Sequence, residues 1–443
     1  MPPSRPSVPL RWIYAAIVIG LSISNSARCD LAASARPVAS TESGWPQFRG
    51  PHRDGICDER NLLPSWPESG LKVIWTAANL GNGFSSPIVV RDRIFITGDV
   101  GEELHLFALN LKGQLIWQAK NGAAWNAEYP GARATPTYYN GYVYHRNAHG
   151  RIACFNATDG KEVWAVAPSE RFGGKNITWG LSECLLVDER AVYSTVGGTT
   201  ALAIALDRKS GELLWQAAPI SDSEGEQAIE TPSYVSPILA EFAGRQLLIG
   251  CSLKHLFGID ARTGERQWIT RLPTRYSVLA MMPVFIGPDR IFMTAPHGTG
   301  GHCYQLTAPA KAGDLVGVKE LWTSKLDTCQ GGVIYAGGRL FGSFYSDRKG
   351  WAALDANNGN ILYSNPDFAK GAALFADGKL YALSEDGWML LLEPTDKEFV
   401  VKGRFRLAEA ARRDAWAHPV IHQGRLYLRY HDTLTCYDVH ARP

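Results

Sequence analysis

The sequence has little net charge and no paired cysteine motif, and each absence excludes a class of protein. Its 443 residues include 45 Lys plus Arg and 43 Asp plus Glu, so the net charge of +2 gives no electrostatic reason to bind nucleic acid or an acidic surface. The 8 cysteines stand singly, without a CxxC pair for zinc or redox chemistry. We expect most of them to be buried small hydrophobic side chains, and their spacing assigns no disulfide.

Long apolar runs are also scarce. One stands at the N-terminus, and no second apolar run is long enough to cross a bilayer. The run Trp12 to Ile23 follows Arg5 and Arg11 and is shorter than the roughly 20 residues that a span needs. It therefore predicts a secretory signal, with small residues offering cleavage sites between positions 24 and 35. An uncleaved anchor is the alternative. We expect a mature protein that is soluble, and periplasmic or secreted.

Cys29 raises the question of a lipid anchor, and its neighbour argues against one. A lipidation signal needs a small residue before the cysteine, whereas Arg28 stands there. We therefore expect no lipoprotein. The predicted organisation is a signal peptide and flexible N-terminus over 1–35, an N-terminal arm over 36–70 and a single folded domain over 71–443.

What the sequence does contain is material for a large core and a clear internal repeat. It is 45% hydrophobic and holds 14 Trp and 44 Gly, which excludes disordered and collagenous chains. One motif recurs: an apolar run ending in Asp or Asn, a polar turn with Gly, and a second run ending in an aromatic residue. Clear copies end at Trp117, Trp164, Trp215, Trp268 and Tyr363.

The motif has the chemistry of a tight hairpin. Side chains such as Asp207 and Asn156 can bond the amides of their own turns, and glycines such as Gly211 and Gly160 can take the positive φ that such turns require. The closing Trp is large enough to wedge between neighbouring repeats. Each copy therefore predicts the outer two strands of one repeating unit.

Counting the units gives eight, and the chain ends complete the count. Weaker copies end at Trp75, at Trp322 and near Val400, and the intervals match a four-stranded propeller blade. A two-stranded element precedes each motif, which also gives eight. Residues 434–439 are a third strand without a fourth, and the LKVIW segment 71–75 is a fourth strand without a third. We expect an all-β, eight-bladed β-propeller of four-stranded antiparallel blades, closed by the two chain ends in one blade. Two separate β-sandwiches are the alternative.

These hairpins ending in Trp resemble the pyrroloquinoline-quinone (PQQ) repeat of quinoprotein-type propellers, from Trp45 onward. Segments WPQFRGPHRDG (45–55) and LPSWP (63–67) are similar to the arm that precedes the first blade in secreted proteins of this group. The resemblance implies one of two classes: quinone-dependent dehydrogenases, or cofactor-free scaffolds of the BamB type, which assist outer-membrane protein assembly. Fold alone does not separate them.

A dehydrogenase of this group needs a flat quinone pocket, a divalent ion and a carboxylate base. The adjacent cysteines that stack on the quinone in the family are missing, and no calcium-ligand set of Glu, Asn and Asp can be matched. PQQ with calcium therefore stays possible but unsupported, and we assign no metal site.

The predicted site is the channel mouth, where residues just before the innermost strands converge. The expected mouth residues are Phe84, Ser85, Arg133, Trp179, Glu183, Tyr234, Met281, Met282, Cys329, Gln330, Lys370, Trp416 and His418. Arg133, Trp179, Lys370 and Trp416 are candidate cofactor-binding residues. Glu183 is a candidate base or cation ligand. The alternative is that Trp179 plugs the channel and Glu183 pairs with a neighbouring charge such as Arg133 or Lys370.

Two glycine-rich segments near the mouth carry weaker signals. HGTGGH (297–302) connects two strands and lacks a helix terminus or a third ligand, so we expect a glycine turn. TCQGGV (328–333) has Cys329 and Gln330 where related propellers often have His, which weakens an inherited catalytic role.

The sequence thus favours a periplasmic or secreted binding or scaffold protein similar to BamB, with an envelope or extracellular protein as partner and a small-molecule ligand at the mouth as a further possibility. The alternative is a PQQ-dependent oxidoreductase related to alcohol or polyvinyl-alcohol dehydrogenases. A carbohydrate-binding or lyase-like propeller, with mouth aromatics as sugar platforms, is a third reading, although no paired-carboxylate spacing supports this reading.

Overall fold

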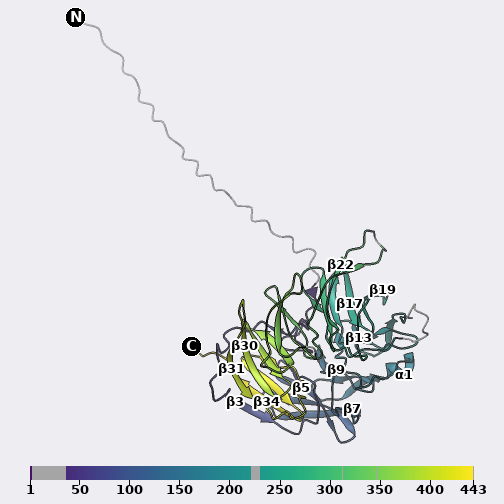
Figure 1. Cartoon of the computed structure of the whole chain (residues 1–443). Helices are drawn as coiled ribbons and strands as arrows, with labels where there is room; N and C mark the ends of the chain where they lie inside the picture. Colours follow the sequence, from purple (N-terminus) through teal and green to yellow (C-terminus); the bar gives the residue numbers. More distant parts are fainter. Residues whose placement is uncertain (2–35, 221–229, 312, 347, 443) are drawn as a thin grey trace. The chain divides into compact units, whose positions relative to one another are not determined.

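The computed structural model describes residues 1, 36–220, 230–311, 313–346 and 348–442, and the regular secondary structure of these residues is almost entirely β-strand (Figure 1). The predicted signal segment and Cys29 lie outside the described residues. One short helix, α1 (Pro168–Phe172), ends at Gly173 in the left-handed conformation. Within the described ranges, no helix is long and apolar enough to cross a membrane.

The first four blades each use four consecutive strands, with the first strand innermost. Blade 1 consists of β4 (Ile88–Val90), β5 (Arg93–Val100), β6 (Glu103–Asn110) and β7 (Leu115–Ala123). Blade 2 consists of β8 (Thr137–Tyr139), β9 (Tyr142–Arg146), β10 (Ile152–Asn156) and β11 (Glu162–Val166). Blade 3 consists of β12 (Leu186–Val187), β13 (Ala191–Thr195), β14 (Ala203–Asp207) and β15 (Leu213–Gln216). Blade 4 consists of β16 (Ile238–Phe242), β17 (Arg245–Cys251), β18 (His255–Asp260) and β19 (Arg266–Arg271).

The remaining blades follow the same order, and the last one is shared between the chain ends. Blade 5 consists of β20 (Val284–Phe285), β21 (Arg290–Ala295), β22 (Gly300–Thr307) and β23 (Gly317–Ser324). Blade 6 consists of β24 (Ile334–Ala336), β25 (Arg339–Ser343), β26 (Trp351–Asp355) and β27 (Ile361–Asn365). Blade 7 consists of β28 (Gly371–Ala376), β29 (Lys379–Ser384), β30 (Trp388–Pro394) and β31 (Phe399–Arg406). Blade 8 consists of β32 (Val420–His422), β33 (Arg425–Tyr430), β34 (Thr433–Asp438) and β3 (Val73–Ala77).

Blade 8 closes the ring as the sequence predicts. Strand β3 pairs antiparallel with β34, Trp75 opposite Cys436 and Ala77 opposite Leu434. Because an early strand completes a sheet built by the last three, the ring cannot open at the chain ends without breaking a β-ladder. The eight-bladed, four-stranded, all-β architecture is confirmed.

The repeat residues join one blade to the next. Trp117 donates its indole N–H to the carbonyl of Ala157 at 3.0 Å, and Trp164 makes the matching bond to Arg208 at 3.1 Å. The turn glycine of the following blade lies on the indole face: a Cβ on Gly211 would sit 2.7 Å from Cε3 of Trp164. The predicted wedge is therefore a two-part contact, a hydrogen bond and a packed ring.

The turn chemistry is also as expected. Asp207 Oδ1 accepts the backbone N–H groups of Lys209 and Ser210 at 2.9 and 2.8 Å, and Gly211 has φ +75°. The indole hydrogen bond is missing after Trp268 and after Trp322 in the described chain, although only the first of these two junctions lacks the turn glycine. Blade 5 has the longer connection 308–316 in place of the glycine turn, and the indole nitrogen of the preceding Trp268 is buried with no hydrogen-bond partner in the described chain.

The N-terminal arm adds one strand to each of two blades and crosses the channel between them. Strand β1 (Arg36–Pro37) pairs with β16, and β2 (Ile56–Cys57) pairs parallel with β28. Between them, Arg49 donates to the carbonyl of Val333 at 2.7 Å, and Arg53 donates to that of Cys184 at 2.7 Å. Both side chains are buried, and they connect the arm to blades on opposite sides of the channel.

Seven cysteines lie in the described part of the chain, and all are buried thiols without a disulfide. Burial raises the pKa of Cys57, Cys154, Cys303, Cys329 and Cys436 to about 12. This agrees with the expectation that they act as small hydrophobic side chains.

Candidate functional site: the channel mouth

The channel mouth forms a pocket of about 290 Å3 in front of the innermost strands. Its rings come from six loops and from the arm: Phe48, Phe84, Tyr129, Trp179, Tyr234, Tyr345, Trp416 and His418. Phe48 packs edge-to-face on His418 with ring centroids 4.8 Å apart, so the arm contributes directly to the pocket wall. The site is a concave, mostly aromatic surface, the kind of place where ligands bind.

The structure brings together most of the predicted mouth residues. Those that line this pocket are Phe84, Arg133, Trp179, Tyr234, Cys329, Gln330, Trp416 and His418. Those that do not are Ser85, Glu183, Met281, Met282 and Lys370. The difference follows the period of two in an extended chain: Ser182 and Cys184 face the pocket, so Glu183 between them points away.

Arg133 organises the loop on one side of the mouth. Its Nη1 donates to the carbonyl of Gly131 at 2.7 Å, Nη2 donates to that of Tyr129 at 2.8 Å, and Nε donates to that of Trp179. The guanidinium also lies 5.1 Å from the ring centroid of Trp125. Burial lowers the pKa of Arg133 to about 10, opposed by the negative charge of Asp99, so it stays charged. Arg133 therefore serves to position the loop and Trp179.

The Trp179 side chain is half-buried, and hydrogen bonds fix both its indole and its backbone. Its indole N–H donates to Glu128 Oε2 at 3.1 Å, and its backbone N–H donates to the Tyr234 hydroxyl at 3.3 Å. The ring centroids of Trp179 and Tyr234 lie 5.9 Å apart. The pocket remains open beside Trp179, so this side chain forms a wall of the mouth and does not fill it.

Trp416 stands on the opposite side, within a cluster of rings. Its centroid lies 4.9 Å from that of Phe84 and 5.1 Å from that of Tyr129. The indole nitrogen of Trp416 is buried and has no hydrogen-bond partner within the described residues. The Trp416 indole N–H is therefore a hydrogen-bond donor without a partner at the pocket wall.

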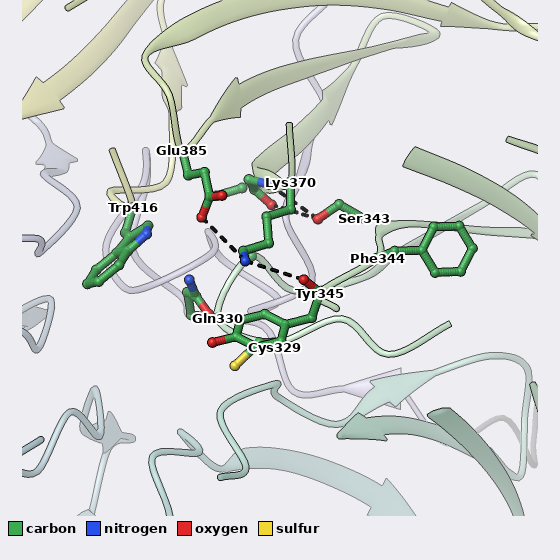
Figure 2. Close-up of a pocket in the computed structure, with 11 residues that line it drawn as sticks. Cys329, Gln330, Ser343, Phe344, Tyr345, Lys370, Glu385 and Trp416 are labelled. Atoms are coloured by element: carbon green, nitrogen blue, oxygen red, sulfur yellow. Dashed lines mark hydrogen bonds and ion pairs between the residues drawn. The ribbon is translucent and has the colours of Figure 1, made fainter. Parts of the chain in front are cut away.

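Lys370 lies beside the mouth in a smaller pocket that shares Cys329, Gln330, Tyr345 and Trp416 with it. Figure 2 shows the ammonium group between the Glu385 carboxylate, 3.6 Å away, and the Tyr345 carbonyl, 3.3 Å away. The amine also sits 4.0 Å from the centroid of the Tyr345 ring. Burial raises the pKa of Glu385, partly offset by Lys370 and Arg413.

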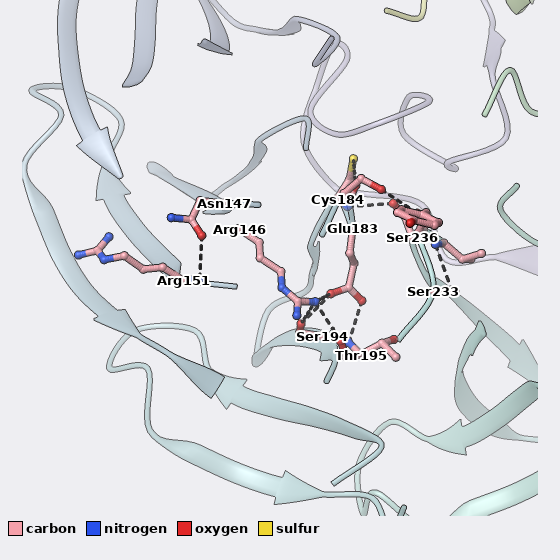
Figure 3. A network of polar contacts seen from close by, with 12 residues as sticks. Arg146, Asn147, Arg151, Glu183, Cys184, Ser194, Thr195, Ser233 and Ser236 are labelled. Carbon is pink, nitrogen blue, oxygen red and sulfur yellow. Dashed lines mark hydrogen bonds and ion pairs between the residues drawn. The ribbon is translucent and has the colours of Figure 1, made fainter. Parts of the chain in front are cut away.

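Glu183 lies between blades 2 and 3 in a buried polar network (Figure 3). Its Oε2 accepts from Arg146 and, at 2.7 Å, from Ser194, and its Oε1 accepts the backbone N–H of Thr195 at 2.7 Å. The carboxylate is 2% exposed, so no ligand in the mouth reaches it. The geometry therefore favours the expected alternative, pairing with a cation, although the partner is Arg146 and neither Arg133 nor Lys370.

Ten of the 18 residues that line this pocket were not among the predicted ones, and three of them are large acidic or aromatic side chains on the loops that shape the site. Glu128 and Tyr129 lie in the loop from blade 1 to blade 2, and Tyr345 follows strand β25. The sequence could have predicted Tyr345, because the second strand of each blade ends at the same mouth at which the first strand begins. Tyr129 had none, because a φ of +52° sets its direction.

The histidines near the mouth do not form a metal centre. His297 lies in the turn between β21 and β22, as expected for a glycine turn, whereas His302 lies within strand β22, with its Nδ1 2.8 Å from Glu320 Oε2. His418 is buried, and burial lowers its pKa to about 3, helped by the charge of Arg49. Among the residues that the structure describes, no group of three or more His, Cys, Asp or Glu side chains could hold a metal ion.

The fold and repeat define the class of protein: an eight-bladed β-propeller with PQQ-like repeats. Residues 105–295 match the family model described as outer membrane protein assembly factor BamB. The outer membrane protein assembly factor BamB of Burkholderia pseudomallei (strain K96243) is 22% identical over 373 residues, which cover 74% of this chain and 89% of that protein. The predicted resemblance to this group is confirmed: the chain is an eight-bladed propeller that is similar to BamB.

Solved structures extend the likeness to most of the fold. BamB from Moraxella catarrhalis has a TM-score of 0.56 at 14% identity and covers 83% of this chain and 99% of that chain. The quinohemoprotein alcohol dehydrogenase of Comamonas testosteroni has a TM-score of 0.65 at 12% identity and covers 92% of this chain and 82% of that chain. At these identities the likeness shows the fold, so the functional class has to be argued from the site.

Proposed function

We propose that the protein is a non-catalytic binding or scaffold protein that works outside the cytoplasm and holds an envelope or extracellular protein partner at its channel mouth. One observation carries this proposal: the mouth is a pre-formed aromatic pocket whose polar groups position the walls. Arg133 is occupied by backbone carbonyls and Glu128 by Trp179. The similarity to BamB supports an envelope location, as does the signal-like N-terminus of the sequence.

The residues present do not fit the dehydrogenase alternative. A quinone held with a divalent ion needs a cluster of oxygen or nitrogen ligands and a carboxylate base. No group of three or more His, Cys, Asp or Glu side chains that could hold a metal ion occurs within the described ranges, and the candidate base Glu183 is sequestered between blades with Arg146. Cys184 and Cys329 line the mouth but are far apart in the sequence and unpaired. We derive no redox step for this pocket.

The proposal is tested by asking whether partner capture depends on the mouth. Envelope extract is passed over immobilised wild-type protein, a Tyr129→Ala/Trp416→Ala variant and the matched control Leu115→Ala, whose side chain is 54% exposed on outer strand β7. We expect the wild type and the control to retain the same partner and the mouth variant to lose it. Equal retention by all three would overturn the assignment of the mouth.

A second measurement addresses the dehydrogenase alternative. Purified protein is titrated with PQQ in the presence of calcium and assayed for dye reduction with a panel of alcohols. We expect neither saturable quinone absorbance nor dye reduction. Alcohol-dependent dye reduction that is lost in the mouth variant would replace the binding proposal with the oxidoreductase one.

A further inference from the structure

The rim of the mouth carries aromatic residues in a conformation that non-glycine residues rarely adopt. Tyr129, Tyr276, His297 and His431 have φ values of +52°, +55°, +61° and +48°. Bulky residues avoid this left-handed region, and strain of this kind collects at functional sites. Each of the four rings contacts another mouth ring, so the strained backbone serves to aim aromatic faces.

These rings form two connected platforms. Tyr129 and Phe84 flank Trp416, with centroids 5.1 and 4.9 Å from it, inside the pocket. From Tyr345 a second row leads outward: His297 lies 4.9 Å from Tyr345, and Tyr276 lies 4.9 Å from His297. Because Tyr276 is 78% exposed, this row reaches the open surface.

The charged groups at the mouth already have hydrogen-bond or ion-pair partners within the protein. Arg133 donates to several backbone carbonyls, Lys370 faces Glu385, and Glu128 accepts from Trp179. An anionic or cationic ligand would have to displace these partners or remain uncompensated in a partly buried site. The electrostatics therefore favour an uncharged ligand.

Hydrogen-bonding capacity nevertheless remains beside the rings. The indole N–H of Trp416 is buried and unpartnered within the described chain, and Gln330 brings its amide to the same wall. Figure 2 shows Gln330 between Trp416 and Tyr345. A ligand that satisfies this site needs both apolar faces and hydroxyl groups.

We infer that the mouth binds neutral sugar rings, stacked on Trp416 and hydrogen-bonded at their edges, with the row from Tyr345 to Tyr276 receiving further rings of an oligosaccharide. This inference rests on the proposed function, because it takes the mouth to be the recognition surface. A pyranose ring presents C–H faces to aromatic side chains and hydroxyls to amides, and it carries no charge. The pocket of about 290 Å3 is at the small end of ligand sites, which suits one or two such rings.

The test is binding to an array of neutral and acidic oligosaccharides, followed by titration of each hit by calorimetry. We expect a neutral oligosaccharide to bind, with an affinity about tenfold or more weaker for Trp416→Ala. Trp388→Ala is the matched control, because Trp388 is a half-buried Trp on blade 7, contacted by the guanidinium groups of Arg404 and Arg406, and does not line the mouth. Trp416→Phe keeps a ring, removes the N–H donor and provides a variant with minimal disturbance of folding; we expect intermediate affinity.

The sugar has two possible sources, a free oligosaccharide or a glycan on a protein partner, and periodate separates them because it cleaves sugar diols. If the glycan is on the partner, periodate treatment of the envelope extract abolishes mouth-dependent capture. No neutral hit on the array together with periodate-resistant capture would overturn the sugar inference while leaving the proposed function standing. Binding of acidic oligosaccharides alone would also overturn it. Absence of both sugar binding and mouth-dependent capture would remove the proposed function as well.

Discussion

Gly264 in blade 4 lies against the indole face of Trp215 in blade 3, where a Cβ atom would sit 2.8 Å from ring carbon Cε3. The same indole donates its N–H to the carbonyl of Ala261 at 2.9 Å. One side chain thus satisfies a buried carbonyl and covers a turn of the next blade. The recurrence of this contact explains why Gly and Trp recur together in the sequence.

Replacing Gly264 with Ala is expected to destabilise the protein by about 2–4 kcal/mol, because strain at positive φ and overlap with Trp215 add. Gly244→Ala is the matched control: its φ is +73°, close to +80° for Gly264, but nothing lies within 4 Å of its Cβ position. The control measures the strain alone, about 1 kcal/mol. Denaturant unfolding gives both values, and equal losses would show that the Trp contact adds nothing.

The propeller was predictable because its signals are redundant. Asp207, Gly211 and Trp215 each report the same hairpin, and the set recurs, so degraded copies did not disturb the count. Closure was predictable because residues 71–75 and 434–439 are complementary halves of one motif. These features depend on local turn chemistry and periodicity, which a sequence displays directly.

The mouth was only partly predictable, because side-chain direction there depends on more than the position of a strand. Glu183 precedes an inner strand, yet the alternation of the extended chain turns it toward Arg146 while Cys184 faces the pocket. Tyr129 reaches the pocket through a left-handed backbone conformation that its own sequence does not favour. Loops that are not part of the repeat show no periodic pattern in the sequence, so the direction of their side chains could not be predicted from it.

Loss of the Glu183 carboxylate is expected to reduce stability and leave ligand binding at the mouth unchanged. Glu183→Ala strands the Arg146 guanidinium in a buried site, at a cost of about 3–5 kcal/mol. Glu162→Ala is the control, since Glu162 pairs with Arg151 at 2.7 Å but is 40% exposed; it should cost less than about 1 kcal/mol. Comparable small losses for both variants would contradict the structural role of Glu183.

The buried thiols are expected to resist alkylation in the native protein. Burial raises the pKa of Cys154 and Cys436 to about 12, so the reactive thiolate is scarce at neutral pH, and access is blocked as well. Iodoacetamide followed by peptide mass spectrometry should label none of the seven described cysteines before unfolding and all seven afterwards. A pair that stays unlabelled after unfolding without reductant would reveal a disulfide.

The last prediction concerns His145, which is buried as the neutral imidazole. Its Nδ1 accepts from the Asn121 amide at 2.9 Å, and its Nε2 donates to the carbonyl of Ala134 at 3.2 Å. A proton on Nδ1 would face the Asn121 donor, in agreement with burial lowering the pKa of His145 to about 4. Since the unfolded chain binds this proton near pH 6.5, the contribution of His145 to stability is present above that pH and lost as the pH falls toward 4.

Between pH 6.5 and 4.5 this linkage amounts to about 2 kcal/mol of unfolding free energy. His145→Gln removes the titrating group, so the variant should lose about 2 kcal/mol less than the wild type over that interval, whatever its stability at neutral pH. Urea unfolding at pH 4.5, 5.5 and 6.5 measures the difference. Asp99 acts in the opposite direction, because burial raises its pKa to about 6, but it is present in both proteins and largely cancels from the comparison. Parallel pH profiles for the two proteins would mean that His145 is protonated as readily in the folded state as in the unfolded one, and the assignment of Nδ1 as an acceptor would be wrong.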